Sequence, residues 1–241
     1  MLEFTNLKSN IYNLSSNIGG NINMALTKQE WLALEAKAHQ LRLDLLETTN
    51  MAGSGHIGGS SSVMDILVIL YYKYMNLKVE DPNWEDRDRC ILSKGHAGIG
   101  YAPLLVDKGW NDAEQLKTFN LTGSKMGIHL DSNKVVGVDA STGSLGHGLS
   151  IAVGTALAAR VTGKSYKTYC ILGDGELDEG SNWEAAMSAA NFKLGVHNKV
   201  FGTGRSLVVF FLRRVFIPRD FRFHIECLFI YRDGFRAVPV K

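Results

Sequence analysis

The sequence has few cysteines, no long hydrophobic run and almost no net charge, and each shortage argues against a class of protein. Its three cysteines in 241 residues, Cys90, Cys170 and Cys227, are odd in number and far apart, so they predict neither a disulfide framework nor a cysteine zinc site, and a reducing cytoplasm is expected. The longest apolar run, 66–72, is far shorter than the ~18 residues that span a bilayer. The formal charge is only +2, from 26 Lys and Arg against 24 Asp and Glu. Neither a membrane-spanning protein nor a nucleic-acid-binding protein is therefore expected.

The charge is unevenly distributed, which divides the chain near residue 200. Residues 200–241 contain seven Arg and one Lys against three acidic residues, a net charge of +5, together with eight of the eleven Phe. Residues 1–199 therefore carry −3. We interpret 196–241 as an atypical basic, aromatic tail. Either it binds nucleic acid or a membrane surface, or it results from a shifted reading frame, which we favour because only 207–212 resembles a strand and no helical period follows it.

Hydrophobic periodicity predicts an α/β fold in the middle of the chain. The Asn-rich residues 1–23 are expected to form a flexible amino-terminal arm, and Thr27 and Glu30 form a capping-box pattern before an amphipathic helix. The expected helices cover 28–48, 63–75 with a cap at Ser60 to Ser62, 111–119, 149–161 and 181–193, and an expected buried strand covers 166–172. Glycine loops alternate with these elements, which indicates a parallel sheet flanked by helices, with ligands at the carboxyl ends of the strands. One domain is expected over 24–195.

The strongest local signal is Gly173-Asp174-Gly175-Glu176-Leu177-Asp178-Glu179-Gly180, directly after the expected strand. A carboxylate between glycines can approach a charged ligand without interference from a neighbouring Cβ atom. Mg²⁺ commonly binds one or two carboxylates together with ligand phosphates, and the helix after the loop favours an anion. Asp174 is therefore the candidate metal ligand. A simple turn between a strand and a helix explains the same triplet, and the motif alone does not decide between the two interpretations.

Four of the seven histidines, His56, His96, His129 and His147, lie in or beside glycine loops. Imidazoles at the ligand edge of a sheet suit proton transfer and hydrogen bonding to a polar substrate, although a single loop histidine more often has no role. The sequence contains no G-x-x-x-x-G-K-[ST] phosphate loop, no dinucleotide-binding fingerprint near its start and no G-x-S-x-G nucleophile elbow. These absences argue against the common nucleotide-binding folds and against a hydrolase.

Five motifs together resemble those of transketolases in order and approximate spacing. They are Gly53-Ser54-Gly55-His56-Ile57-Gly58-Gly59, Ser93-Lys94-Gly95-His96-Ala97, Gly127-Ile128-His129, Thr142-Gly143-Ser144-Leu145-Gly146-His147-Gly148 and Gly173-Asp174-Gly175-x-x-x-Glu179. More narrowly, the chain resembles the amino-terminal subunit of the split transketolases of bacteria and archaea. The resemblance covers about Met24 to Leu194 and implies a thiamine diphosphate-binding fold, which would be truncated at its carboxy-terminal side.

The resemblance implies a transferase that uses thiamine diphosphate and Mg²⁺ to move a two-carbon ketol unit between sugar phosphates in the pentose phosphate pathway. Asp174 would ligate Mg²⁺ on the diphosphate, the histidines would face the diphosphate and the sugar, and Glu179 would belong to an interface network around the cofactor. Lys94 is interpreted as ordinary variation within its loop. The implied residues are the catalytic His56, His96 and His129, the cofactor-binding Gly143, Leu145, Gly146, Asp174, Gly175 and Glu179, and the metal ligand Asp174.

The resemblance also implies a partner. Transketolases build their site between two chains or domains, and the pyrimidine-binding half, with the glutamate that activates the cofactor, is not found in this sequence. A carboxy-terminal transketolase subunit is therefore the expected partner, within a homo- or hetero-oligomer.

One position departs from the family pattern. Transketolases have an Asn about thirty residues after the Gly-Asp-Gly aspartate, and it supplies the second protein ligand to Mg²⁺, whereas this chain has Gly204 there. The departure, together with the tail, keeps a second hypothesis open: a catalytically incompetent remnant that acts at most as a binding module. A related thiamine diphosphate enzyme, such as a deoxyxylulose phosphate synthase, is a further alternative, but the Gly-His motifs and Asp178-Glu179-Gly180 look more like transketolase.

Overall fold

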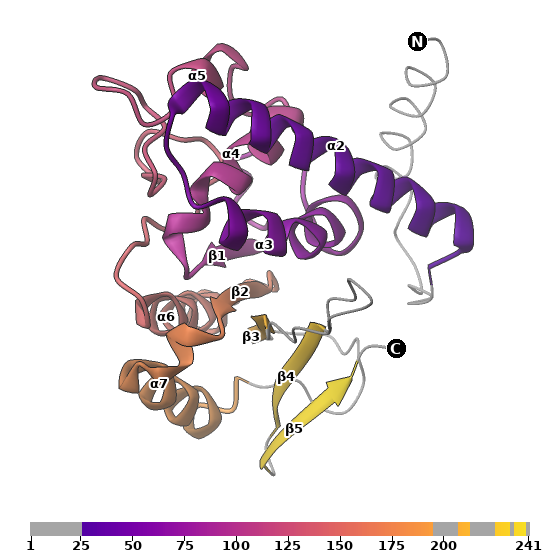
Figure 1. The fold of residues 1–241 in the computed structure, drawn as a ribbon. Coiled ribbons are helices and arrows are strands. Elements are labelled where there is room, and N and C mark those ends of the chain that lie inside the picture. The colour runs from indigo at the N-terminus through magenta and orange to yellow at the C-terminus, as the bar shows by residue number, and fades with distance from the viewer. Residues whose placement is uncertain (1–25, 195–206, 213–224, 232–233, 240–241) are drawn as a thin grey trace, which may run out of the picture.

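A five-stranded sheet lies between two layers of helices in the computed structural model, which describes residues 26–194 and the backbone of three strands within 207–239 (Figure 1). The strands are, in sheet order, β1 (Arg89–Leu92), β2 (Thr168–Gly173), β3 (Leu207–Leu212), β4 (Ile225–Tyr231) and β5 (Gly234–Pro239). The first three run parallel, as the sequence predicts, and β4 and β5 are antiparallel to their neighbours. Only two residues separate β4 from β5, which suits a hairpin and is far too short for a parallel crossover.

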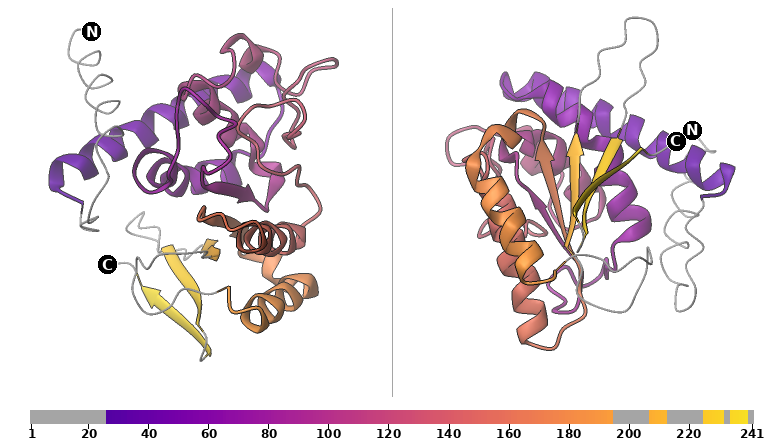
Figure 2. Two further views of the ribbon diagram at one scale, coloured as in Figure 1. Left: turned by 180° about the vertical axis from the view of Figure 1, so that it is seen from behind. Right: turned by 90° about the horizontal axis from the view of Figure 1, so that it is seen from below.

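Each face of the sheet is covered by its own helices, and the views in Figure 2 show the same layering. One layer contains α2 (Lys28–Ala52), α3 (Ile57–Ile69), the π-helical turn η1 (Leu70–Tyr74), α4 (Gly98–Asp107) and the short α5 (Glu114–Lys117). The other contains α6 (His147–Val161) and α7 (Gly180–Asn191). Two single turns, η2 (Gly95–Ala97) and η3 (Gly175–Asp178), come within three residues of the ends of β1 and β2. The expected parallel-sheet fold flanked by helices is thus confirmed.

β1 and β2 are apolar at most positions because both of their faces are buried. Successive side chains of a strand point to opposite faces, and the core divides accordingly. Cys90, Leu92, Tyr169 and Ile171 pack into the cluster of α2, α3 and α4, while Ile91, Cys170 and Leu172 pack into that of α6 and α7. The sheet therefore holds both helical layers in fixed positions relative to the ends of β1 and β2.

Three expected helices differ from the observed ones by about a turn or more, whereas those over 149–161 and 181–193 agree with α6 and α7 to within two residues. The capping box of Thr27 and Glu30 is present, but α2 continues one turn past 48 to Ala52 and is capped by Gly53, whose φ is 62°. The expected cap at Ser60 to Ser62 is wrong, because α3 begins at Ile57 and the Ser62 hydroxyl instead donates back to the Gly59 carbonyl (3.0 Å). The expected helix over 111–119 is reduced to the four residues of α5.

Local sequence preference does not predict α4, which follows the second glycine loop. Gly98, Gly100 and Pro103 are all unfavourable in a helix, so local preference argues against one. The packing explains their presence, since a Cβ atom at Gly100 would lie 2.8 Å from the Ser60 Cβ atom of α3. Close contact between two buried helices therefore overrides the local preference.

Candidate functional site at the carboxyl ends of β1 and β2

The loops after β1 and β2 lie side by side at one edge of the sheet. Leu92 pairs with Ile171, and the Ser93 amide donates to the Ile171 carbonyl (2.9 Å), which continues the pairing past the end of β1. Asp174 directly follows β2 at the start of η3, and its side chain is exposed. The structure thus places the candidate metal ligand Asp174 at the expected ligand edge of the sheet.

The three histidines interpreted as catalytic gather beside this edge. The ring centroids of His56 and His96 are 5.1 Å apart, and the ring of His129 lies against Gly143, where an added Cβ atom would be 3.3 Å from its Cδ2 atom. Burial lowers the pKa of His96, and the charges of His56, Lys94 and His129 lower it further. Loops that are far apart in the sequence therefore bring their imidazoles within electrostatic reach of one another. His147, the fourth loop histidine, is exposed at the first position of α6.

Glycines allow the loops at this edge to approach more closely than other residues would. A Cβ atom at Gly95 would lie 2.3 Å from the Thr142 carbonyl oxygen, so the second and fourth glycine loops are in direct contact. Gly146, the N-cap of α6, has a φ of 88°, and a Cβ atom there would lie 2.6 Å from the Cβ atom of Glu179. The predicted cofactor-binding residues Gly146 and Glu179 are therefore neighbours.

The remaining predicted cofactor-binding residues are exposed at the same loops. Gly143 and Leu145 lie on the surface just before α6, and Gly175 lies on the surface beside Asp174. A Cβ atom built on Gly175 meets no other atom within 4 Å, so open space adjoins the candidate metal ligand. A charged group can therefore approach the backbone of this turn.

Glu176 is a buried carboxylate beneath the loops, and the sequence interpretation missed it. Its side chain is only 1% exposed. One carboxylate oxygen accepts hydrogen bonds from the Ser93 hydroxyl and the Gly146 amide (2.8 Å), and the other accepts from the Gly173 amide (3.0 Å). The motif Gly173-Asp174-Gly175-Glu176 contains the signal, since Glu176 lies in the first turn after a buried strand.

Lys94 is a second candidate residue that the sequence does not single out, since its motif alone suggests only ordinary loop variation. The side chain is 4% exposed, and its Nζ atom donates to the Gly59 carbonyl (2.8 Å) and the Ser62 hydroxyl (3.3 Å). Burial lowers the pKa of Lys94 to about 8, against the opposing effect of the Asp174 and Glu176 carboxylates. A buried ammonium group therefore faces the same turn as the candidate metal ligand.

The residues at this edge fit a diphosphate that carries a divalent cation. Asp174 offers an exposed carboxylate, Lys94 offers a positive charge, and the space beside Gly175 admits a ligand. In the part of the chain that the structure describes, no three or more His, Cys, Asp or Glu side chains gather as a metal cage. Mg²⁺ commonly binds one or two carboxylates together with oxygen atoms of a ligand, and Asp174 offers one such carboxylate. Gly204, where a second protein ligand is expected, lies outside the described residues.

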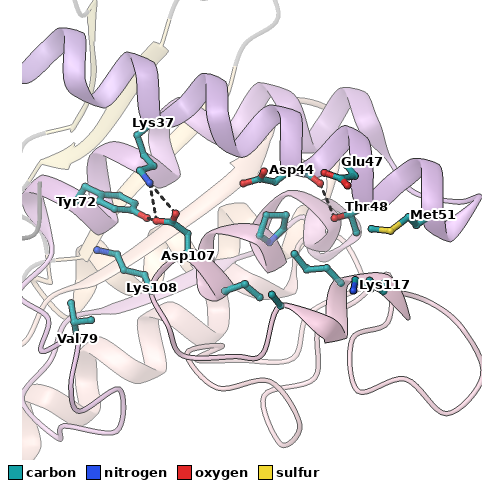
Figure 3. Close-up of a pocket in the computed structure, with 14 residues that line it drawn as sticks. Lys37, Asp44, Glu47, Thr48, Met51, Tyr72, Val79, Asp107, Lys108 and Lys117 are labelled. Carbon is teal, nitrogen blue, oxygen red and sulfur yellow. Dashed lines mark hydrogen bonds and ion pairs between the residues drawn. The ribbon is translucent and has the colours of Figure 1, made fainter. Parts of the chain in front are cut away.

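A separate cavity of about 470 Å³ lies between α2, η1, α4 and α5 (Figure 3). Charged side chains of its wall are paired with one another. The Lys37 ammonium binds both oxygens of Asp107 (2.9 and 3.1 Å), and the Tyr72 hydroxyl donates to the same carboxylate. Lys108, 6% exposed at the carboxyl end of α4, places its Nζ atom 3.7 Å from the centroid of the Tyr72 ring. The Lys37–Asp107 pair joins α2 to α4, so we interpret this cluster as structural.

Replacing Lys108 by Met is expected to stabilise the protein at pH 7 and to lose that advantage at alkaline pH. Burial lowers the pKa of Lys108 to about 8 from an ordinary value of 10.5, so the folded state disfavours its charge. The resulting cost is fully present below pH 8 and disappears as the pH rises through 10.5, a change of about 3 kcal/mol. The free energy of unfolding in urea, measured at pH 7 and pH 10.5, gives the difference between the variant and the wild type. Lys125→Met at an exposed position is the control, and an equal difference at both pH values would contradict the expectation.

Within the described part of the chain, none of the helices has both the length and the apolar character needed to cross a membrane.

Comparison with known proteins supplies a family and relatives for this arrangement. Residues 34–202 match the family model described as transketolase, thiamine diphosphate binding domain. This match extends past Leu194, the residue at which the resemblance is expected to end. The chain is 42% identical over 166 residues to the 6-deoxy-6-sulfo-D-fructose transketolase subunit SqwG of a Clostridium species, covering 69% of this chain and 60% of that protein. It is 42% identical over 163 residues to one of the subunits of the apulose-4-phosphate transketolase of Actinobacillus succinogenes, covering 68% and 59%. The matched part thus spans about 60% of the length of these relatives.

Solved structures agree with these sequence matches. Transketolase from Campylobacter jejuni is similar with a TM-score of 0.63 and 34% identity, covering 66% of this chain and 26% of that one. Transketolase from Leishmania mexicana is similar with a TM-score of 0.65 and 31% identity, covering 74% of this chain and 27% of that one. In both cases the similarity is confined to about a quarter of the larger protein.

Proposed function

The chain belongs to the transketolase family, and from that premise we propose that it is the amino-terminal, cofactor-binding subunit of a two-subunit transketolase. It would transfer a two-carbon ketol unit between sugar phosphates, in the cytoplasm and within the pentose phosphate pathway. The observation that carries the proposal is the meeting of three histidines, a buried ammonium group and an exposed carboxylate at one edge of the sheet. The family match to the thiamine diphosphate-binding domain supports the identity of the cofactor.

Each group at this edge has a distinct task under the proposal. Thiamine diphosphate, when bound, supplies the carbanion stabilisation that ketol transfer needs. Asp174 would hold Mg²⁺ on its diphosphate, and Lys94 would add positive charge beneath the same group. The cofactor-lining residues would be Gly143, Leu145, Gly146, Gly175 and Glu179, with Glu179 near the interface to the partner.

His56, His96 and His129 would bind the hydroxyl groups of the sugar and move protons. The lowered pKa of His96 keeps its imidazole neutral near pH 7, so it can accept a proton from a hydroxyl group or donate a hydrogen bond. His56 and His129 are exposed at the same edge and can therefore reach a bound substrate. Orientation and proton handling are the contributions that we assign to this chain.

Replacing Lys94 by Met is expected to weaken the binding of thiamine diphosphate by about 10-fold or more, because a buried charge-assisted contact to the diphosphate is lost. Binding of thiamine without its diphosphate should change much less. Titration calorimetry with both compounds measures the difference, and Lys125→Met at an exposed position serves as the control. An equal loss for both compounds would show that Lys94 acts only by fastening Gly59, and not through its charge.

A carboxy-terminal transketolase subunit is the partner that this proposal requires. The two relatives above are named as transketolase subunits, which supports a split enzyme. Their names also mention different sugars, 6-deoxy-6-sulfo-D-fructose and apulose-4-phosphate, so membership of the family leaves the sugar open. Only apulose-4-phosphate is a sugar phosphate, so our proposal of sugar phosphates in the pentose phosphate pathway rests on the family resemblance and not on these two names.

The test is reconstitution of activity with the carboxy-terminal subunit encoded in the same genome. The two chains, thiamine diphosphate, Mg²⁺ and a panel of ketose and aldose phosphates are combined, and product formation is followed by mass spectrometry. Ketol transfer that needs both chains and the cofactor supports the proposal. Cofactor binding without turnover on any substrate would support the second candidate, a catalytically incompetent binding module, for which Gly204 at the expected Asn position is the specific observation.

The domain boundaries and the origin of the tail have a test of their own. We propose an arm over 1–23, a cofactor domain over 24–195 and a tail over 196–241 that comes from a shifted reading frame. Resequencing the DNA around codon 195 and translating all three frames tests the last point. A frame that encodes an Asn near position 204 supports a shift, whereas confirmation of the present frame, with no such alternative, would refute it.

A further inference from the structure

Glu176 connects three segments that carry the proposed cofactor-binding groups. Ser93 precedes Lys94, Gly146 is the N-cap of α6, and Gly173 precedes Asp174. The Ser93 hydroxyl and the Gly146 amide donate to one oxygen of the Glu176 carboxylate, and the Gly173 amide donates to the other. A single side chain thus fixes the relative positions of the second, fourth and fifth glycine loops.

The hydrogen bonds around Glu176 explain how a carboxylate can be buried here. A buried charge is costly unless it is paired and hydrogen-bonded, and hydrogen bonds to an ionised group are about twice as strong as neutral ones. Glu176 receives three such bonds, and the positive charge of Lys94 lies close enough to interact with it. The Glu176 carbonyl also accepts a hydrogen bond from the Asn182 side chain (2.6 Å), which connects the turn η3 to α7.

Ser93 extends this network to the helix that follows the fourth glycine loop. Its Oγ atom accepts from the Gly148 amide (3.1 Å) while its hydroxyl donates to Glu176. A Cβ atom at Gly148 would lie 2.3 Å from that oxygen, so the contact is too close for any other residue. The amino end of α6 is therefore fastened both directly and through Ser93.

We propose that Glu176 is a positioning residue that holds the three loops in their cofactor-binding arrangement before the cofactor arrives. The side chain is 1% exposed, so it cannot itself touch a ligand and acts only through the groups that it fixes. Preorganised loops lower the cost of binding because fewer groups must be ordered in the complex. The inference rests on the proposed function for the identity of the cofactor, while the preorganisation of the loops does not depend on it.

Glu176→Gln is the decisive variant because glutamine keeps the size of the side chain but has only one acceptor oxygen. The amides of Gly146 and Gly173 donate to different oxygens, so either orientation of the glutamine leaves one of them facing an NH₂ group. Glu184→Gln is the matched control, since it makes the same change at an exposed position of α7.

Two measurements on the full chain with its partner subunit test the proposal. Hydrogen exchange of the Gly146 and Gly173 amides, without cofactor, is expected to accelerate by about 10-fold or more in Glu176→Gln and to stay unchanged in Glu184→Gln. The dissociation constant for thiamine diphosphate with Mg²⁺ is expected to rise by about 10-fold to 100-fold, with kcat at saturating cofactor changed much less. Unchanged binding and exchange in a folded Glu176→Gln variant would overturn the proposal, as would a fall in thermal stability with no change in binding.

A second variant keeps the proposal testable if Glu176→Gln does not fold. Ser93→Ala removes one donor to the carboxylate and leaves the two backbone donors, so its cofactor dissociation constant should rise by a smaller factor of about 3-fold to 10-fold. An unchanged constant in that variant would overturn the proposal. If the wild-type complex binds no thiamine diphosphate, the proposed function fails, and hydrogen exchange still decides whether Glu176 organises the loops.

Discussion

Asp174→Asn is expected to weaken the binding of thiamine diphosphate in the presence of Mg²⁺ by at least about 100-fold while leaving the fold intact. The carboxylate follows β2 directly, is exposed, and lies near the buried ammonium group of Lys94. Loss of a group that merely supports a metal ligand costs about 10-fold to 100-fold, so loss of the ligand itself should cost at least as much. The turn should survive, because the Leu177 amide donates to the Asp174 carbonyl (3.1 Å) and not to its side chain.

The matched control for this experiment is Asp178→Asn, an exposed acidic residue of the same turn η3. Titration calorimetry with and without Mg²⁺ should show the Mg²⁺-dependent part of the affinity disappear in Asp174→Asn and persist in Asp178→Asn. Thermal unfolding of both variants should remain within about 0.5 kcal/mol of the wild type, as is usual for surface substitutions. Equal weakening in both variants would mean that general negative charge, and not ligation by Asp174, favours the cation.

Asp139→Asn is expected to destabilise the fold by about 3–5 kcal/mol, the usual cost of breaking a buried ion pair by changing one partner. The Asp139 carboxylate binds the Arg87 guanidinium through both oxygens (2.7 and 3.1 Å), and the two side chains are 5% and 9% exposed. It also accepts from the Cys90 amide at the start of β1 (2.7 Å). The variant would leave the buried Arg87 charge without an equivalent partner. Asp139 itself lies in the segment that leads to the fourth glycine loop.

Urea unfolding at pH 7 measures this loss, and Glu85→Gln is its control. Glu85 also forms an ion pair, with Lys164 (3.0 Å), but its side chain is 83% exposed. Exposed pairs contribute about 1 kcal/mol or less, so the control should unfold close to the wild type. If Asp139→Asn also unfolds within about 1 kcal/mol of the wild type, the buried pair does not hold the β1 edge in place.

The sequence predicts the position of the site well because its loops contain glycine, histidine and aspartate motifs that have few other structural explanations. Asp174 stands at the end of an apolar strand, and parallel strands bring their carboxyl ends to one edge, so its location follows from pattern alone. His56, His96 and His129 belong to glycine motifs that resemble those of one family. Their gathering at that same edge is seen in the structure, whereas their catalytic roles stay predictions.

Burial is what the sequence could not supply. Glu176 and Lys94 are common surface residues by type, and nothing in their spacing shows that both side chains are almost fully enclosed. The same holds for α4, whose Gly100 and Pro103 argue against a helix until the close approach to Ser60 is known. The start of α3 at Ile57 was missed because Ser60 to Ser62 are typical caps, although these serines lie inside the helix. In each case a tertiary contact decides what local preference leaves open.

Direct titration of thiamine diphosphate into this chain, combined with its carboxy-terminal partner in the presence of Mg²⁺, tests the central claim most directly. We expect saturable binding at one site per chain that needs the divalent cation and is lost in Asp174→Asn. A complex that is folded and correctly assembled but takes up no thiamine diphosphate would contradict the assignment of this sheet edge as the cofactor site.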